Sequence, residues 1–119
     1  MLKLVYAVRR KPEMPLVEFQ RYWLEEHGGL SKKLKEDMPT FVHYVQSHTV
    51  YGEATDKVRA ARGTAEPFDG ITEAWFDNSI EVKDAEAQMK AVGQMLADEA
   101  HFIDAENSVV FYTEEHEIF

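Results

Sequence analysis

The 119-residue sequence contains no cysteine. This absence excludes disulfide bonds, thiolate nucleophiles, iron–sulfur clusters and cysteine-ligated zinc. Long hydrophobic runs are also missing, because charged residues follow at once after the short apolar stretch in MLKLVYAVRRKP. That start can neither span a bilayer nor act as a signal peptide, so we expect no membrane partner and a cytoplasmic location.

Basic residues are scarce. Thirteen Lys and Arg stand against twenty-two Asp and Glu, which gives a formal net charge of -9. Such a charge repels phosphate backbones, so nucleic acid is not an expected partner. The sequence also lacks the zinc-protease, phosphate-loop, dinucleotide-binding and nucleophile-elbow motifs. We therefore expect neither a cofactor nor a metal site.

The pattern of apolar residues predicts a single α+β domain over residues 1–119 with the order strand–helix–strand–strand–helix–strand. This is a ferredoxin-like βαββαβ sandwich, in which two helices lie on one face of a four-stranded antiparallel sheet. The expected strands span residues 2–9, 40–50, 70–77 and 107–116.

Two apolar stripes predict the helices. The first comprises Leu16, Phe19, Trp23, His27, Leu30 and Leu34. Gly28-Gly29 interrupts this stripe, so we expect a break or kink there. The second helix is expected to be capped by Asn78 or Ser79, with Phe102 and Ile103 packed beneath its end. Its expected inward face comprises Val82, Ala85, Met89, Val92 and Leu96.

The segment 51–68, YGEATDKVRAARGTAEPF, has scattered charges and no clear periodicity. We expect a long, mobile loop with no more than one helical turn near Ala60. Loops of this length are uncommon in small domains and are often functional.

Both faces of the predicted sheet are apolar. In the first strand, Leu4 and Tyr6 alternate with Val5 and Ala7. Two helices cover one face only, and a solvated second face would carry alternating polar residues. We therefore expect a homodimer that covers this face. The alternative is that a loop or the tail folds over it.

Candidate catalytic residues are His27 and His48. His27 lies on the inward stripe of the first helix, directly before two glycines that permit a ligand to approach closely. A histidine near a helix end can have a shifted pKa and transfer a proton. The competing interpretation is a structural core histidine.

Three side chains of the second strand, Tyr44, Gln46 and His48, share one parity with Val42. On a face that the dimer should cover, they are typical of a cavity lining that orients carbonyls and hydroxyls. An exposed strand edge is the alternative.

Glu73 and Trp75 share a face of the third strand. A carboxylate buried beside an indole is a candidate general acid or base, and the indole could pack against a substrate ring. The alternative is an interface hydrogen bond or ion pair. Tyr6 completes the expected substrate-binding set of Tyr6, Tyr44, Gln46, Glu73 and Trp75.

The segments LVYAVRRKP, VEFQRYWLEEHGGL, FVHYVQSHTV, FDGITEAWFD and DEAHFIDAENSVVFYTEEH together resemble the EthD family across nearly the whole chain. The signature is Phe19, Trp23, His27 and Gly28, followed by Tyr44-Val45-Gln46 and His48. Gly29 stands where members commonly carry proline.

The resemblance implies a dimeric α/β-barrel in which two sheets face each other and enclose a pocket per subunit. The wider superfamily includes cofactor-independent monooxygenases, cyclases, isomerases and haem-handling proteins. EthD members occur in xenobiotic degradation and as dehydratase-like enzymes on aromatic polyketides. A shared fold does not fix a function.

The leading hypothesis is a protein that binds a small apolar or aromatic carbonyl metabolite and acts on it as a cofactor-free dehydratase, cyclase, isomerase or monooxygenase. His27 or His48 would move the proton, and Tyr44 and Gln46 would stabilise the oxyanion. The alternatives are a non-catalytic small-molecule-binding accessory protein of an oxidase pathway, or a haem binder.

Overall fold

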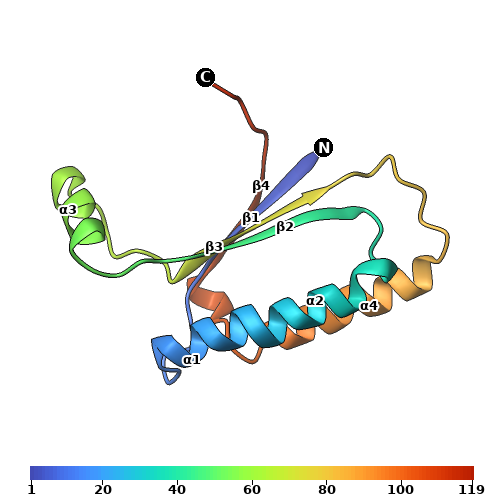
Figure 1. Cartoon of the computed structure of the whole chain (residues 1–119), viewed down its shortest axis with the longest axis horizontal. Helices are drawn as coiled ribbons and strands as arrows, with labels where there is room; N and C mark the ends of the chain where they lie inside the picture. The colour runs from blue at the N-terminus through green and yellow to red at the C-terminus, as the bar shows by residue number, and fades with distance from the viewer.

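The computed structural model describes all residues 1–119, and it has the ferredoxin-like fold (Figure 1). Its strands are β1 (Leu2–Val8), β2 (Phe41–His48), β3 (Gly70–Phe76) and β4 (Val109–Thr113). They form one sheet in the order β2-β3-β1-β4, and every neighbouring pair is antiparallel. The predicted α+β class and strand order are confirmed, with strand ends shifted by no more than three residues.

Helices cover one face of this sheet. The first helical region consists of α1 (Leu16–Arg21), the π-helical segment η1 (Tyr22–His27), α2 (Gly28–Leu34) and the 3-10 turn η2 (Lys35–Asp37), and it lies beside α4 (Ala85–Glu99) (Figure 1). A further 3-10 turn, η3 (Ala105–Asn107), precedes β4. No helix covers the opposite face, and only 12 of 119 residues are buried. None of the helices has the length and apolar character needed to cross a bilayer.

The helical course does not break at the two glycines, although an irregular turn lies directly before them and the short second segment expected there, α2, begins at Gly28. Gly28 has ordinary helical angles, with φ −61° and ψ −41°. The irregularity lies just before it, where the Gly28 N–H bonds to the Trp23 carbonyl five residues back. Positions four residues apart drift around a regular α-helix, and one wider turn offsets that drift. The segment therefore keeps Phe19, Trp23 and His27 on the side that packs inward.

The second predicted helix begins later than expected. Asp84, rather than Asn78 or Ser79, is the N-cap of α4, and its carboxylate accepts a 3.0 Å hydrogen bond from the Ala87 N–H. The predicted inward face is only partly correct, because the Met89 side chain is 76% exposed while Ala91 is buried.

Segment 51–68 contains a helix, α3 (Glu53–Arg62), where a loop was expected. Gly63 ends this helix in the left-handed conformation, with φ 62°, as is common for a C-terminal glycine. None of its residues is buried, and it stands away from the sheet (Figure 1). Apolar periodicity reports burial, so it gives no signal for a helix that packs against nothing.

The hydrophobic core lies at one end of the sheet, where β1 ends beneath the start of the first helical region. It comprises Val8, Phe19, Trp23, Phe102 and Ile103. Phe102 and Ile103 follow directly on the end of α4, where their N–H groups bond to the Glu99 carbonyl, and their side chains pack into this core. Beyond this core, towards the other end of the helices, the space between the sheet and the helices is only partly filled.

Candidate active site

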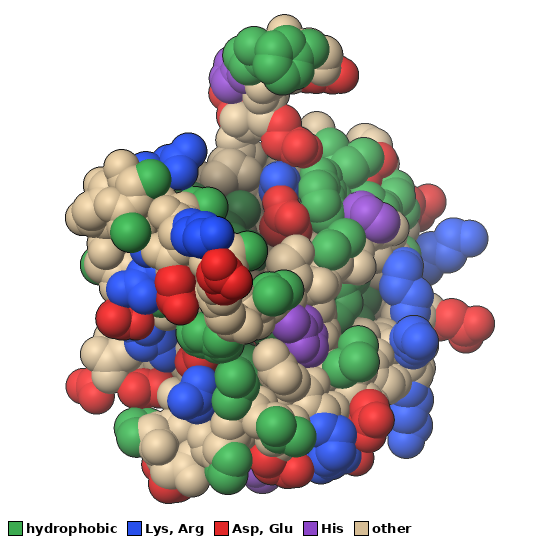
Figure 2. Space-filling view, turned by 60° about the vertical axis from the view of Figure 1, so that its left-hand side comes forward, with side chains coloured by type: hydrophobic (Ala, Val, Ile, Leu, Met, Phe, Trp, Pro, Cys, Tyr) green, Lys and Arg blue, Asp and Glu red, His purple; other side chains and the backbone are tan.

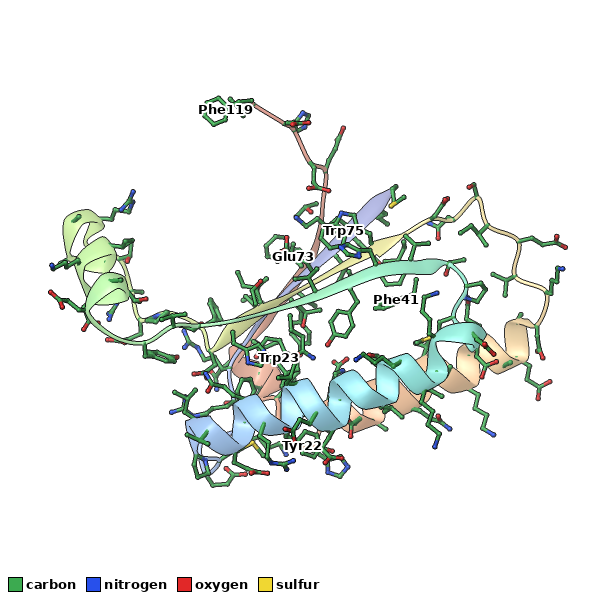
Figure 3. The ribbon with its side chains drawn as sticks, in the orientation of Figure 1. Tyr22, Trp23, Phe41, Glu73, Trp75 and Phe119 are labelled. Atoms are coloured by element: carbon green, nitrogen blue, oxygen red, sulfur yellow. The ribbon has the colours of Figure 1, made fainter.

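A cavity of about 320 Å³ lies between the helices and the sheet. Thirteen of its sixteen lining residues are hydrophobic, and the other three are His27, Thr72 and Glu99. Trp23 and Phe41 extend into the space between the helical layer and the sheet (Figure 3). A concave, largely apolar site with a few polar groups is typical of small-molecule binding.

His27 is 5% exposed and is held by a carboxylate from α4. Its Nδ1 lies 2.7 Å from Asp98 Oδ2, and Asp98 Oδ1 accepts a 2.6 Å hydrogen bond from the Tyr22 hydroxyl. Burial and this hydrogen bond raise the pKa of Tyr22 to about 12. Since a carboxylate only accepts, Nδ1 carries the proton of neutral His27, and Nε2 is its unprotonated nitrogen.

Tyr44, Gln46 and His48 form one hydrogen-bonded row on β2. The Gln46 Nε2 group donates to the Tyr44 hydroxyl oxygen and to the Trp23 carbonyl, both at 2.8 Å. The His48 Nε2–H donates to Gln46 Oε1 at 2.8 Å, and the His48 ring stacks on Trp23 with centroids 4.4 Å apart. Burial lowers the pKa of His48. The row faces the helices, so its expected position on the face covered by a dimer is wrong.

Three phenols, those of Tyr6, Tyr44 and Tyr112, and the carboxyl group of Glu99 lie in the cavity wall. Burial raises the pKa of Tyr44, although the hydrogen bond from Gln46 opposes the shift. Burial and the nearby Glu99 raise the pKa of Tyr6. Burial, followed by repulsion from Asp98, raises the pKa of Glu99 to about 7. At neutral pH, the phenols of Tyr6 and Tyr44 are protonated and can donate hydrogen bonds, and Glu99 is divided between its two forms.

Glu73 and Trp75 lie on the other side of the sheet (Figure 3). The Glu73 carboxylate forms an ion pair with Lys3, and this pairing raises the pKa of Lys3. The Trp75 Nε1–H donates to Glu115 at 2.8 Å. The expected site residues are therefore divided by the sheet. Tyr6, His27 and Tyr44 line the cavity, Gln46 and His48 brace it, and the remaining pair faces away.

A second hollow opens on the surface beside β2 and shares two wall residues, Phe41 and Tyr44, with the cavity. Its volume is about 390 Å³, and Lys32 and Lys35 from the first helical region flank it. These two side chains border both the cavity and the hollow. No cluster of three or more His, Asp or Glu side chains is arranged to hold a metal ion.

Asp98 and Glu99 were not among the residues predicted from the sequence. The position of Glu99 could have been predicted, because it lies three residues after Leu96 on the apolar stripe that runs through Val92 and Leu96. Asp98 gives no such signal, since its partners Tyr22 and His27 are more than seventy residues away in the chain.

A family model described as the EthD domain matches residues 11–106 of the chain. The chain belongs to the EthD family. The matched range contains the first helical region, β2, β3 and all of α4, and so it includes His27, Asp98 and Glu99. Among curated protein sequences, none matches this EthD domain significantly.

The EthD domain is also similar to a solved structure, the crystal structure of an ethyl tert-butyl ether d (EthD) family protein from Bacillus halodurans C-125. The TM-score is 0.59 at 17% sequence identity, with 98% of this chain and 99% of that chain covered. At this identity the similarity supports the fold and gives no information on the reaction.

Proposed function

We propose that this EthD domain binds a small, largely apolar carbonyl or aromatic metabolite in the cavity between helices and sheet, and moves a proton on it without a cofactor. One observation carries the proposal. In a largely apolar cavity wall, His27 is oriented through Nδ1 by Asp98, which leaves Nε2 as the basic nitrogen. A histidine oriented in this way is a common arrangement for a general base.

The proposed chemistry begins with a carbon acid. The Nε2 atom of His27 removes a proton from the carbon next to the ligand's carbonyl group, and the electron pair moves onto the carbonyl oxygen. The Tyr44 hydroxyl, which already accepts from Gln46, is free to donate to that oxygen. Enolate formation is a first step available to dehydration, cyclisation, isomerisation and oxygenation alike.

His48 has a different place in this proposal. It lies outside the cavity lining, and its Nε2–H is engaged by Gln46. We assign it a positioning role, since it fixes the amide group that in turn holds Tyr44 and the Trp23 carbonyl. Its loss should weaken the arrangement without removing the base.

Hydrogen–deuterium exchange tests the proposal without a known substrate. Aryl alkyl ketones incubated in D2O should exchange the protons next to the carbonyl faster with the protein than without it, as followed by NMR. We expect His27→Gln to lose about 10²–10⁴-fold of that acceleration. His48→Gln should lose less, and the exposed His101→Gln serves as the matched control.

Equal exchange by the wild type and His27→Gln would show that His27 is not the base. Binding of the ketones without any exchange would favour the second candidate, a non-catalytic small-molecule-binding protein.

The proposal includes a second copy of the chain on the uncovered sheet face and a cytoplasmic location. Several side chains on that face are apolar and exposed, among them Ile71 at 41%, Val109 at 48% and Phe111 at 50%. An apolar sheet face of this kind is typical of an association surface.

A further inference from the structure

Glu99 is the one carboxyl group in the cavity wall, and no side chain pairs with it. It projects from the last turn of α4 into a lining whose members are mostly aliphatic and aromatic. Only burial and the neighbouring Asp98 act on its ionisation, with no hydrogen bond and no cation. Glu99 is half-buried, and a carboxyl group largely withdrawn from water without a protein partner gains a hydrogen bond when a ligand or water reaches it.

The titratable groups that face Glu99 come from the helices and from three strands of the sheet. Tyr6 of β1, Tyr44 of β2, Tyr112 of β4 and His27 of η1 share the wall with it, and Asp98 lies next to it on α4. No lysine or arginine lines the cavity. An anionic group placed here would lose its hydration and meet no counter-charge.

We propose that Glu99 is the specificity-determining residue of the cavity, and that its carboxyl proton is donated in a hydrogen bond to a neutral carbonyl oxygen of the ligand. The ligand class is therefore an apolar or aromatic ketone, aldehyde or ester, and not a carboxylate. This inference rests on the proposed function, since it assigns the ligand class of the same cavity.

A protonated carboxyl group is a strong donor, and a carbonyl oxygen is an acceptor that needs no counter-ion. Burial, with repulsion from Asp98, keeps a large share of Glu99 protonated near neutral pH by raising its pKa to about 7. The competing ligand is an organic cation, because an ionised Glu99 among aromatic rings would also suit one. The two ligands differ in the sign of their pH dependence.

Calorimetric titration with three matched ligands separates these cases. Acetophenone is neutral, benzoate is anionic and phenyltrimethylammonium is cationic, and none of them titrates between pH 6 and pH 8. If only protonated Glu99 binds the ketone, acetophenone affinity falls about tenfold over this range. Glu99→Gln keeps an N–H donor and should show no such fall, whereas His27→Gln should retain it.

The other possible results contradict either the role of Glu99, the ligand class or the proposed function. A fall that persists in Glu99→Gln and disappears in His27→Gln assigns the pH dependence to the histidine. Benzoate that binds as tightly as acetophenone at pH 8, or a cation that binds more tightly than the ketone as pH rises, overturns the ligand class. Failure of all three ligands to bind at any pH overturns the proposed function itself, and this inference with it.

Unfolding measurements give a second readout that needs no ligand. The pKa of Glu99 is about 7 in the folded protein and about 4.5 in the unfolded chain, so the folded state binds more protons between these values. The stability of the wild type therefore decreases as pH rises from about 4.5 to about 7. Glu99→Gln lacks this contribution, so the urea midpoint of the wild type should fall relative to the variant across that window. A constant difference between the two midpoints would mean that Glu99 titrates normally, which overturns the inference whether or not ligands bind.

Discussion

Asp98 joins the two helices behind the cavity. Its two carboxylate oxygens accept from Tyr22 and His27, which lie on the first helical region, while Asp98 itself lies near the end of α4. His27 is buried and Tyr22 is half-buried. If the carboxylate were removed, bulk water could not fully replace it as the acceptor for either donor. The carboxylate thus contributes to stability as well as to the orientation of His27.

Asp98→Ala should lower the free energy of unfolding by about 2 kcal/mol, because it leaves two donors without their acceptor. Urea unfolding followed by circular dichroism at pH 7 measures this loss. Lys90→Ala, at an exposed position on the same helix, is the control and should change stability by less than about 0.5 kcal/mol. Similar values for the two variants would contradict the role of Asp98.

The site residues that could be predicted from the sequence are those that lie on apolar stripes of helices and strands. His27 stands out because it falls on the inward stripe of a helix, and alternation along β2 groups Tyr44 with Gln46 and His48. Parity separates the two faces of a strand, but it does not say which face meets the helices. Glu73 and Trp75 were therefore assigned to the pocket, although they lie on the other face. The Asp98 contact depends on packing between distant helices.

At the scale of elements, the strands and the two packed helices were predictable because each buries an apolar face. The irregular features were not. The helix continues through Gly28-Gly29 because the surrounding packing outweighs the low helix propensity of glycine. Helix α3 escaped prediction because it packs against nothing, and its only clear boundary signals are Gly52 and Gly63.

Two glycines of the fold differ in the space around them. A β-carbon at Gly70 would lie 2.6 Å from the Ser47 carbonyl oxygen and would overlap the Trp23 ring. At Gly93, on the exposed side of α4, such a carbon would meet no atom within 4 Å apart from its chain neighbours and the backbone of its own helix. Gly70 is thus required where β3 passes beneath the first helical region, and Gly93 is not.

Gly70→Ala should therefore lower stability by about 1–3 kcal/mol, since the core has to shift to accommodate the methyl group. Gly93→Ala should raise stability by up to about 1 kcal/mol through helix propensity. Thermal unfolding of both variants beside the wild type tests the pair. A stabilised Gly70→Ala, or a clearly destabilised Gly93→Ala, would contradict this packing.

At the scale of the whole molecule, the sheet has one covered and one bare face. The space-filling view shows hydrophobic and charged side chains mixed over the surface, with the C-terminal tail standing clear of the body (Figure 2). The tail contacts the bare face through Glu115, which accepts from Trp75 and lies 3.7 Å from Lys3. This contact covers one corner only, and the apolar rows of β4 and β3 beside it stay exposed.

If a second copy covers this face, the wild type should sediment as a dimer at micromolar concentration, and Phe111→Glu should sediment as a monomer. A carboxylate buried at the centre of such an interface would have no partner. The control is Val17→Glu, at a position of α1 that is 77% exposed, and it should leave the dimer intact. A monomeric wild type would show that the second copy is not the cover.

The single-layer sheet has a consequence for laboratory evolution of this protein. Thr72 borders the cavity, whereas Glu73, the next residue, belongs to the opposite surface, and Leu4 and Val5 alternate in the same way. Variants selected for a new ligand should accumulate changes at even-numbered positions of β1 and β3. Variants selected for altered self-association should change at the odd-numbered positions of these strands. Ligand specificity and self-association can therefore be altered independently of each other.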